Sequence, residues 1–213
     1  MPEFHFKTKL DQTLLLGLKA RTVEELLGHL QQVPDSSIYY HTHKFLHQHH
    51  YLSPEPPNDF AYWISEVLND AELGEHLSSV DIIQYNTLAD LRARFVEVIK
   101  SHLASTGPGA HAPRGEEFYF MASRLFVLST PHVAHSLTEF RDILQHISVN
   151  SLYFHVFDAR LRLQQGENDF SRWFSDLGKQ KLAEYMGRLD PYTQTLEGLR
   201  QRILQLVARY DKD

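Results

Sequence analysis

The chain has 213 residues, of which 42% are hydrophobic and 23% charged, and its formal net charge is −6. This composition favours a packed core over disorder, and the acidic balance, with a pI near 6.1, excludes the basic field that nucleic-acid binding requires. Cysteine is absent, which excludes disulfides, thiolate metal sites and cysteine nucleophiles.

The amino terminus begins Met1-Pro2-Glu3-Phe4-His5 and has no basic segment leading into an apolar run, so it does not resemble a secretory signal. Apolar runs such as 14–16 are far shorter than the roughly 20 residues of a membrane span. We therefore expect a soluble cytoplasmic protein that makes no membrane contact.

The first element is an alternating apolar segment at 4–6, which is typical of a short strand with one buried face. Residues 13–18 fit either a strand or a helix. Thr22 and Glu25 then have the spacing of a capping box, in which the hydroxyl accepts a backbone N–H and the glutamate reaches back. This spacing predicts a helix, and its apolar stripe consists of Val23, Leu26, Leu27 and Leu30.

A second helix is predicted from about Ser37 to His50, and it ends before a proline-rich loop at 53–57. Asn58 or Asp59 caps a third helix, because a side-chain oxygen at that position accepts a free backbone N–H. A short helix follows around 73–77, and the last and longest one runs from Thr87 to about Leu103. The third helix has apolar residues at helical spacing, namely Phe60, Trp63, Ile64, Val67 and Leu68.

The same order of features returns in the second half of the sequence. A displacement of 114 residues places Phe4 on Phe118 and His41 on His155, and later segments match at displacements of 110 and 108. The sequence therefore predicts a duplication, with a first helical unit at 1–103, a linker at 104–117 and a second helical unit at 118–213. The expected fold is mainly α: two tandem homologous helical units, each opening with a short extended segment, packed about a pseudo-twofold axis.

Four short motifs follow one another in the first half: Ser-Ile-Tyr-Tyr-His at 37–41, Asn-Asp-Phe-Ala-Tyr-Trp at 58–63, Leu-Gly-Glu-His-Leu at 73–77 and Leu-Ala-Asp-Leu-Arg at 88–92. In this order they resemble a prokaryotic domain family of unknown function. Members of that family carry one Ser-Leu-Tyr-His-His-like element and one Asn-Asp-Phe-Ala-x-Trp element. The resemblance implies no activity. In the second half Ala61-Tyr62 is replaced by Ser171-Arg172.

The candidate ligand-binding residues are His41, His155, Asp59 and Asp169, because both halves carry them. One interpretation makes the histidines acid–base or metal groups that face each other from the two halves. The other is structural: each imidazole holds a neighbouring loop, through the carboxylate of Asp59 or Asp169, and each Asn-Asp pair caps its helix. We favour the structural interpretation, because position 41 lies at the border of the apolar stripe.

A histidine-rich segment occurs in the first half alone and is the candidate partner surface. His43 and His47 are four residues apart, and His50 and Tyr51 follow. A histidine pair at this helical spacing can bind zinc, copper or nickel. However, Lys44 stands where the familiar helical zinc signature has a glutamate, and no acidic third ligand is near in sequence. We therefore predict a solvated face without a physiological metal, and no cofactor.

No phosphate-binding loop, dinucleotide fingerprint, nucleophile elbow or helical zinc signature is present. The leading hypothesis is a non-enzymatic regulatory or adaptor protein that binds a protein partner or a small molecule. The alternative is a metal-dependent enzyme or metal sensor that uses histidines and aspartates between the two units. A pH-responsive structural protein is a third hypothesis, since the chain has 14 histidines. Whether the protein is an enzyme or a homo-oligomer stays open.

Overall fold

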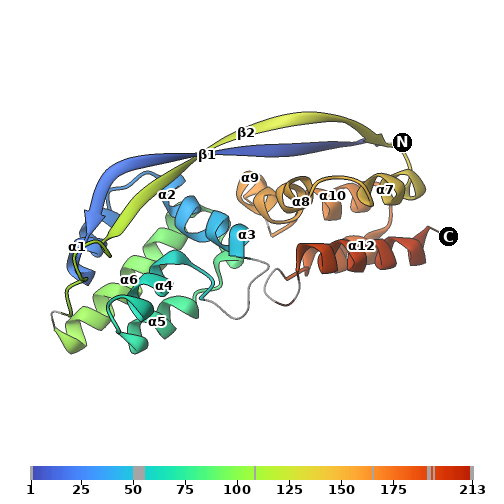
Figure 1. Cartoon of the computed structure of the whole chain (residues 1–213). Helices are drawn as coiled ribbons and strands as arrows, with labels where there is room; N and C mark the ends of the chain where they lie inside the picture. Colours follow the sequence, from blue (N-terminus) through green and yellow to red (C-terminus); the bar gives the residue numbers. More distant parts are fainter. Residues whose placement is uncertain are drawn as a thin grey trace. The chain divides into compact units, whose positions relative to one another are not determined.

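The structure is a computed structural model that describes residues 2–49, 56–107, 109–164, 166–190, 193 and 195–211. Two strands, each of 17 residues, pair with one another in a two-stranded sheet (Figure 1). Helices make up most of the remaining described chain. In order, the elements are β1 Phe4–Ala20, α1 Val23–Leu30, α2 Asp35–Tyr39, η1 Tyr40–Lys44, α3 Phe45–His49, α4 Asp59–Glu66, α5 Ala71–Ser78, η2 Ile82–Gln84, α6 Leu88–Thr106, β2 Phe118–Ala134, α7 Leu137–Leu144, α8 Val149–Tyr153, η3 Phe154–Asp158, α9 Ala159–Leu163, α10 Asp169–Asp176, α11 Gln180–Gly187 and α12 Leu196–Tyr210.

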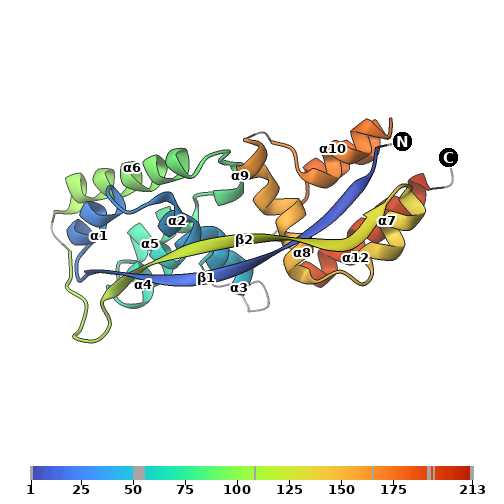
Figure 2. The same ribbon diagram turned by 90° about the horizontal axis from the view of Figure 1, so that it is seen from above.

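The prediction of a mainly α fold with two tandem helical units is wrong. The protein has an α+β fold, because the extended segments expected to be short are long paired strands. β1 continues through residues 13–18, which the sequence left open, to Ala20. The strands lie side by side in both ribbon views (Figures 1 and 2).

The two strands are antiparallel, as the contacts between them show. The hydroxyl of Thr130 donates to the carbonyl of Phe6 at 2.7 Å, and the hydroxyl of Ser123 donates to the carboxylate of Asp11 at 3.0 Å. The position in β2 therefore falls as the position in β1 rises, which is the defining register of an antiparallel pair.

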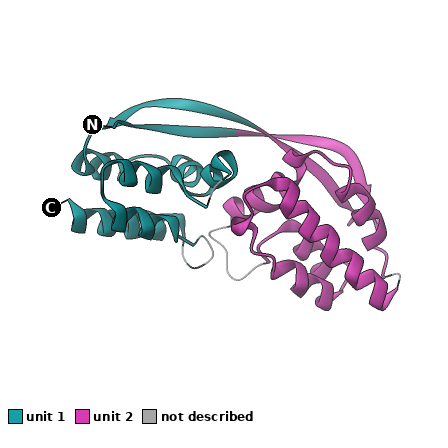
Figure 3. Ribbon diagram, turned by 180° about the vertical axis from the view of Figure 1, so that it is seen from behind, with its two compact units in different colours: residues 1–10, 125–213 teal, residues 11–124 magenta. Residues whose placement is uncertain are grey.

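The described chain divides into two compact units, which Figure 3 shows in different colours. Unit 1 comprises residues 1–10 and 125–213, and unit 2 comprises residues 11–124. The start of β1 thus belongs with α7 to α12, and the start of β2 belongs with α1 to α6. Residues 4–10 of β1 come from the first half of the sequence and belong with the helices of the second half. Residues 118–124 of β2 come from the second half and belong with the helices of the first half.

The hydrophobic core of each unit contains aromatic residues of the strand segment that comes from the other half of the sequence. In unit 1, Phe4 packs edge-on against Phe140 and Phe170, with ring centroids 5.7 and 5.3 Å apart. In unit 2, Phe118 packs against Phe60 at 5.4 Å. Phe6 and Phe120 are also completely buried, in unit 1 and unit 2 respectively. Aromatic residues predicted to begin each helical half therefore complete the core of the opposite one.

The predicted helix starts are confirmed. Thr22 accepts from the N–H of Glu25, and the Glu25 carboxylate accepts from the N–H of Arg21 at 2.7 Å. Asn58 caps α4 by accepting from Ala61. Thr87 caps α6, which continues to Thr106, three residues past its predicted end. Local capping chemistry therefore sets these boundaries.

The helix expected from about Ser37 is continuous from Asp35 through α2, η1 and α3, and η1 is a π-helical turn. A second π-helical turn, η3, occupies the corresponding place between α8 and α9. Most of the proline-rich loop, together with His50 and Tyr51, lies outside the described residues. No helix in the described part of the chain is long and apolar enough to cross a membrane.

Candidate functional site

In unit 2 the π-helical turn η1 buries the imidazole of His41 between the helices and β2. Its Nδ1 lies 2.5 Å from Oδ2 of Asp59, and its Nε2 accepts a hydrogen bond from the backbone N–H of Met121 at 3.0 Å. A nitrogen that accepts cannot carry a proton, so the proton sits on Nδ1 and is donated to the carboxylate.

Unit 1 repeats this arrangement with β1. Nδ1 of His155 lies 2.7 Å from Oδ2 of Asp169, and Nε2 accepts from the backbone N–H of Lys7 at 2.8 Å. The Ser151 hydroxyl donates to the carbonyl of Lys7 at 2.6 Å. Each histidine–aspartate pair thus fixes one strand to the helices beneath it.

The ionisation of the second pair reflects its burial. Desolvation lowers the pKa of His155, and the positive charge of Arg162 lowers it further, whereas Asp169 opposes both effects. Burial alone would raise the pKa of Asp169, but the hydrogen bond from His155 and the charge of Arg162 outweigh it, so that pKa is lowered. The pair is therefore a neutral imidazole beside a carboxylate at neutral pH.

The four predicted ligand-binding residues form two pairs, His41 with Asp59 in unit 2 and His155 with Asp169 in unit 1. Both ring nitrogens of each histidine already have hydrogen-bond partners. A metal ion or a substrate proton would have to displace a backbone N–H or a carboxylate to reach them. This geometry favours the structural interpretation. Within the described residues, no group of three or more metal-ligating side chains is placed to hold a metal ion.

The predicted partner surface is only partly described. His43 is 2% exposed, and its ring stacks on Tyr39 with centroids 5.6 Å apart. His43 therefore cannot meet a partner in this structure. His47 is half-buried, and His50 and Tyr51 lie outside the described residues. His43 belongs to the π-helical turn η1 and lies in the interior, whereas its spacing from His47 predicted a solvated face.

Above the His155–Asp169 pair, unit 1 has an open hollow of about 290 Å³. Phe4, Leu163 and Trp173 are apolar residues of its lining, and His155 and Asp169 line it as well. Its rim is charged on both sides. The rim residues are Glu3, His5, Lys7, Arg162, Arg172 and Asp176.

Arg162 is held in place at this rim. Its guanidinium stacks over the ring of Phe154 at 4.2 Å and donates through Nη2 to Asp169 at 2.6 Å. A guanidinium has five N–H donors, so others remain for a ligand. In the part of the chain that the structure describes, the side chains of Lys7 and Arg172 form no ion pair, and both are exposed.

Two ion pairs, one buried and one partly buried, also join the strands to the helices. Lys9 lies 2.5 Å from Asp158 in unit 1, where both side chains are at most 5% exposed. In unit 2 the charges are reversed, and Lys44 from the helix lies 2.9 Å from Asp11 on the strand. Tyr40 lies beneath Lys44, and burial raises the pKa of its phenol. These groups are occupied with one another, which indicates a structural role.

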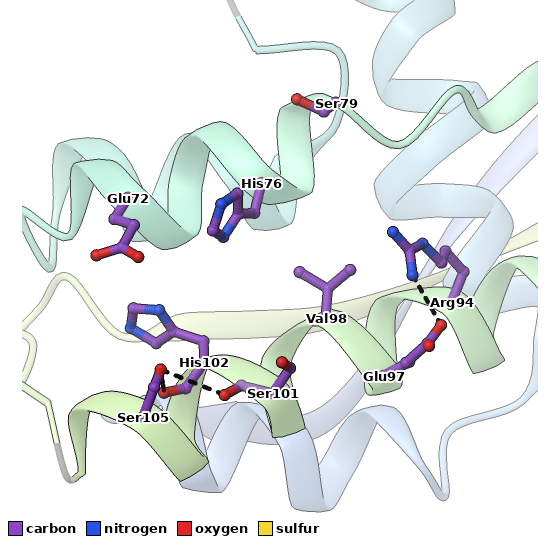
Figure 4. A pocket seen from close by; sticks show the side chains of 9 residues that line it. All are labelled: Glu72, His76, Ser79, Arg94, Glu97, Val98, Ser101, His102 and Ser105. Atoms are coloured by element: carbon purple, nitrogen blue, oxygen red, sulfur yellow. Dashed lines mark hydrogen bonds and ion pairs between the residues drawn. The ribbon is translucent and has the colours of Figure 1, made fainter.

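Unit 2 has a second hollow, a groove of about 340 Å³ between α5 and α6. Figure 4 shows Glu72 and His76 on one wall and His102 on the other. His102 Nε2 lies 2.8 Å from Asp70, and Arg94 pairs with Glu97 at 2.8 Å. The imidazole of His102 and the guanidinium of Arg94, both on the α6 wall, are thus each engaged by a carboxylate.

A further surface feature lies in the part of β2 that belongs to unit 1. Leu125, Phe126, Val127 and Leu128 follow one another and are 40–49% exposed. Neighbouring residues in a strand point to opposite faces, so both faces of the strand are uncovered there. Exposed apolar runs of this kind mark interaction surfaces in soluble proteins.

Sequence reasoning missed the cations of the hollow and the exposed apolar run. For the hollow a signal existed: Ser171-Arg172 replaces Ala61-Tyr62 between the halves, which places an arginine at this position in the second half alone. For the run, the stretch Leu-Phe-Val-Leu at 125–128 is visible as an apolar segment. Only the structure shows that it lies in a strand and is exposed.

The family model described as "Family of unknown function (DUF5752)" matches residues 1–208. The chain belongs to this family. A solved structure described as "The structure of OrfY from Thermoproteus tenax" is similar to it, with a TM-score of 0.83 and 28% sequence identity. The similarity covers 100% of this chain and 97% of that one. No curated protein matches the sequence. The expected resemblance to a family of unknown function is confirmed.

Proposed function

We propose that this member of the DUF5752 family is a non-enzymatic regulatory or adaptor protein that binds a protein partner, and that it acts in the cytoplasm. The observation that carries the proposal is the exposed apolar run Leu125–Leu128 of β2. The sheet that the structure describes has two strands, so β2 pairs with β1 along one edge and has no strand along the other. An open apolar edge is a template on which an extended partner segment can add a strand.

The charge around the run suggests the chemistry of the partner. The exposed run begins after Arg124, and residues 124–135 contain no acidic residue. A partner segment with alternating apolar and acidic residues would meet the apolar side chains and Arg124 together. We therefore propose an extended, acidic-apolar segment of another protein as the partner.

The alternative, a metal-dependent enzyme or sensor, has less support. It requires free imidazole nitrogens on His41 and His155, and each of these nitrogens has a hydrogen-bond partner. Metal analysis of the untagged protein tests it directly: stoichiometric metal that disappears in His155→Ala would favour the alternative over the adaptor.

We also infer that the two halves of the sequence are copies of one strand-plus-helices unit. The support is that corresponding residues make corresponding contacts. Trp63 donates to the carbonyl of Glu116 at 2.8 Å and Trp173 to that of Pro2 at 3.0 Å. A residue present in one half alone is then a better candidate for function than a shared one.

The partner proposal is tested by photo-crosslinking from two positions of β2. Phe126 lies in the apolar run and Tyr119 does not, and both are 46% exposed. Benzoylphenylalanine at position 126 should give a discrete adduct in lysate of the source cells, and at position 119 it should not. The adduct should disappear when Leu125 and Val127 are changed to Ser. Equal labelling at both positions, or no adduct at position 126, would refute the proposal.

A further inference from the structure

The hollow of unit 1 differs from the corresponding place of unit 2 chiefly in its cations; among its other lining residues, Leu163 corresponds to His49 and His5 to Tyr119. The sequence correspondence pairs its carboxylates with carboxylates: Glu3 with Glu117, Asp169 with Asp59 and Asp176 with Glu66. The acidic groups are therefore common to both halves. Those at 59 and 169 have a structural task, since each orients a histidine.

The basic residues are not shared. Lys7 corresponds to Met121, Arg172 to Tyr62 and Arg162 to Gln48. Unit 2 folds with Met, Tyr and Gln at these places, so the shared fold does not require positive charge there. Three cations that unit 2 lacks are gathered around one hollow of unit 1, and packing does not explain them.

We propose that this hollow binds a small organic molecule that carries a phosphate or carboxylate group. The anionic group is received by Arg162, with Lys7 and Arg172 beside it, and the organic part lies on Leu163 and Trp173. Arginine suits this task because its planar fork binds oxyanions with two hydrogen bonds. The volume of about 290 Å³ limits the ligand to a small one.

Arg162 is prepared for such a ligand before binding. Its stack on Phe154 and its bond to Asp169 hold the guanidinium at the rim, which reduces the entropy lost when a ligand binds. Lys7 reaches the same rim because its backbone N–H is tied to His155. The histidine–aspartate pair thus positions Lys7 and Arg162. Both ring nitrogens of His155 are already hydrogen-bonded, so the imidazole does not itself bind the ligand.

The two tryptophans provide a built-in comparison. Trp173 lines the hollow and Trp63 occupies the corresponding place in unit 2, so the two indole N–H signals in a ¹H–¹⁵N spectrum report on the two places separately. At low ionic strength, phenyl phosphate and benzoate serve as the two anionic probes and benzyl alcohol as the neutral one. The Trp173 signal should shift saturably with at least one anion, and the Trp63 signal should not. Benzyl alcohol should move neither.

The variants take their residues from the other half. Arg162→Gln, and separately Lys7→Met with Arg172→Tyr, should each weaken anion binding by about tenfold, the usual effect of losing a charged hydrogen bond. Lys100→Met removes an exposed cation elsewhere and should change nothing. The dispersion of the same spectra shows whether each variant is folded.

Several results would overturn the site. These are an unsaturable shift, equal shifts of both indoles, or undiminished binding in the folded Lys7→Met, Arg172→Tyr protein. The comparison of the two anions assigns the ligand to phosphates or to carboxylates. The inference is independent of the partner proposal, because neither anion binding nor its loss bears on crosslinking at position 126.

Discussion

At the scale of single residues, the buried His155 acts through hydrogen bonds that its neutral form makes. His155 accepts a strand N–H on one side and donates to Asp169 on the other, and burial lowers its pKa. A protonated imidazole would lose the bond from Lys7, because both partners would then be donors. The His155 ring must therefore be neutral for its hydrogen bond with the backbone N–H of Lys7 in β1 to form.

This condition predicts a pH dependence of stability. The pKa of His155 in the folded state lies below the value of 6.5 in the unfolded chain, so below pH 6.5 the unfolded state binds more protons. The free energy of unfolding should therefore be constant above about pH 7 and should fall by up to about 1.4 kcal/mol per pH unit as the pH drops from 6.5 toward the folded pKa. Urea titrations between pH 5 and 8 measure it.

The control for this prediction is His155→Gln, which has no titrating ring. Its free energy of unfolding should be lower throughout, and its slope below pH 6.5 should be smaller by the contribution of one proton. Asp169 does not disturb this window, because its lowered pKa places its own loss of stability below about pH 4. Identical slopes in the two proteins would contradict the assignment to His155.

At the scale of elements, the strands exchange between the two halves of the sequence. The aromatic side chains of residues 4–6 complete the core of unit 1, and those of residues 118–120 complete the core of unit 2. A strand end that lies near α1 in the sequence therefore depends on α7 and α10 for its burial. This dependence can be measured element by element.

Phe4→Ala should destabilise unit 1, and Phe118→Ala should destabilise unit 2, each by about 3–5 kcal/mol, the usual cost of removing a buried phenyl ring. Amide hydrogen exchange locates the effect. Phe4→Ala should speed exchange in α10 and α12 and leave α4 and α6 protected, and Phe118→Ala should do the reverse. Faster exchange in α4 and α6 of Phe4→Ala would show that the strands pack on their own halves.

Much at this scale could be predicted from sequence. Capping residues such as Thr22, Asn58 and Thr87 act on neighbouring N–H groups, and their helices begin where expected. The length of the strands could not be predicted, because residues 13–18 show no clear alternation and owe their conformation to a partner strand about 100 residues away in sequence. Strand pairing is a non-local property, and a local pattern does not contain it.

One part of the candidate site could be predicted from the sequence and another could not. The pairing of His41 with Asp59 was suggested by recurrence and by helix position, and the contacts at 2.5 and 2.7 Å in the two units agree with the structural interpretation. The hollow of unit 1 could not be anticipated, since Lys7 and Arg172 are 165 positions apart (172 − 7) and meet only because β1 crosses to the other half's helices.

At the scale of the whole molecule, the compact units do not follow the repeat in the sequence. The repeat in the sequence predicts units at 1–103 and 118–213. The compact units of the structure are instead residues 11–124 and residues 1–10 together with 125–213. Ala112, within the proposed linker, is buried in the core of unit 2, and its N–H donates to Arg21 at 2.8 Å. The stretch before β2 therefore contributes to folded structure.

Two fragments distinguish the alternatives. Residues 11–124 contain both strand segments of unit 2, so this fragment should be helical by circular dichroism and unfold cooperatively. Residues 1–103 lack Phe118 and Phe120, two buried aromatic residues of that core, and should melt without cooperativity or at a clearly lower temperature. Equal cooperativity and equal melting temperatures would contradict the strand exchange.

The exchange also imposes an order on biosynthesis. Phe4 and Phe6 leave the ribosome before the helices on which they finally pack, which lie between residues 137 and 210, so they wait until that later part of the chain has been made. Meanwhile the nascent helices of the first half offer a pocket shaped for their counterparts, Phe118 and Phe120. Correct folding thus requires that Phe118 and Phe120, which are synthesised later, occupy the core of the first-half helices instead of Phe4 and Phe6. A slow or stalled translation step between residues 107 and 118 favours a misfolded intermediate in which Phe4 and Phe6 pack on the helices of their own half.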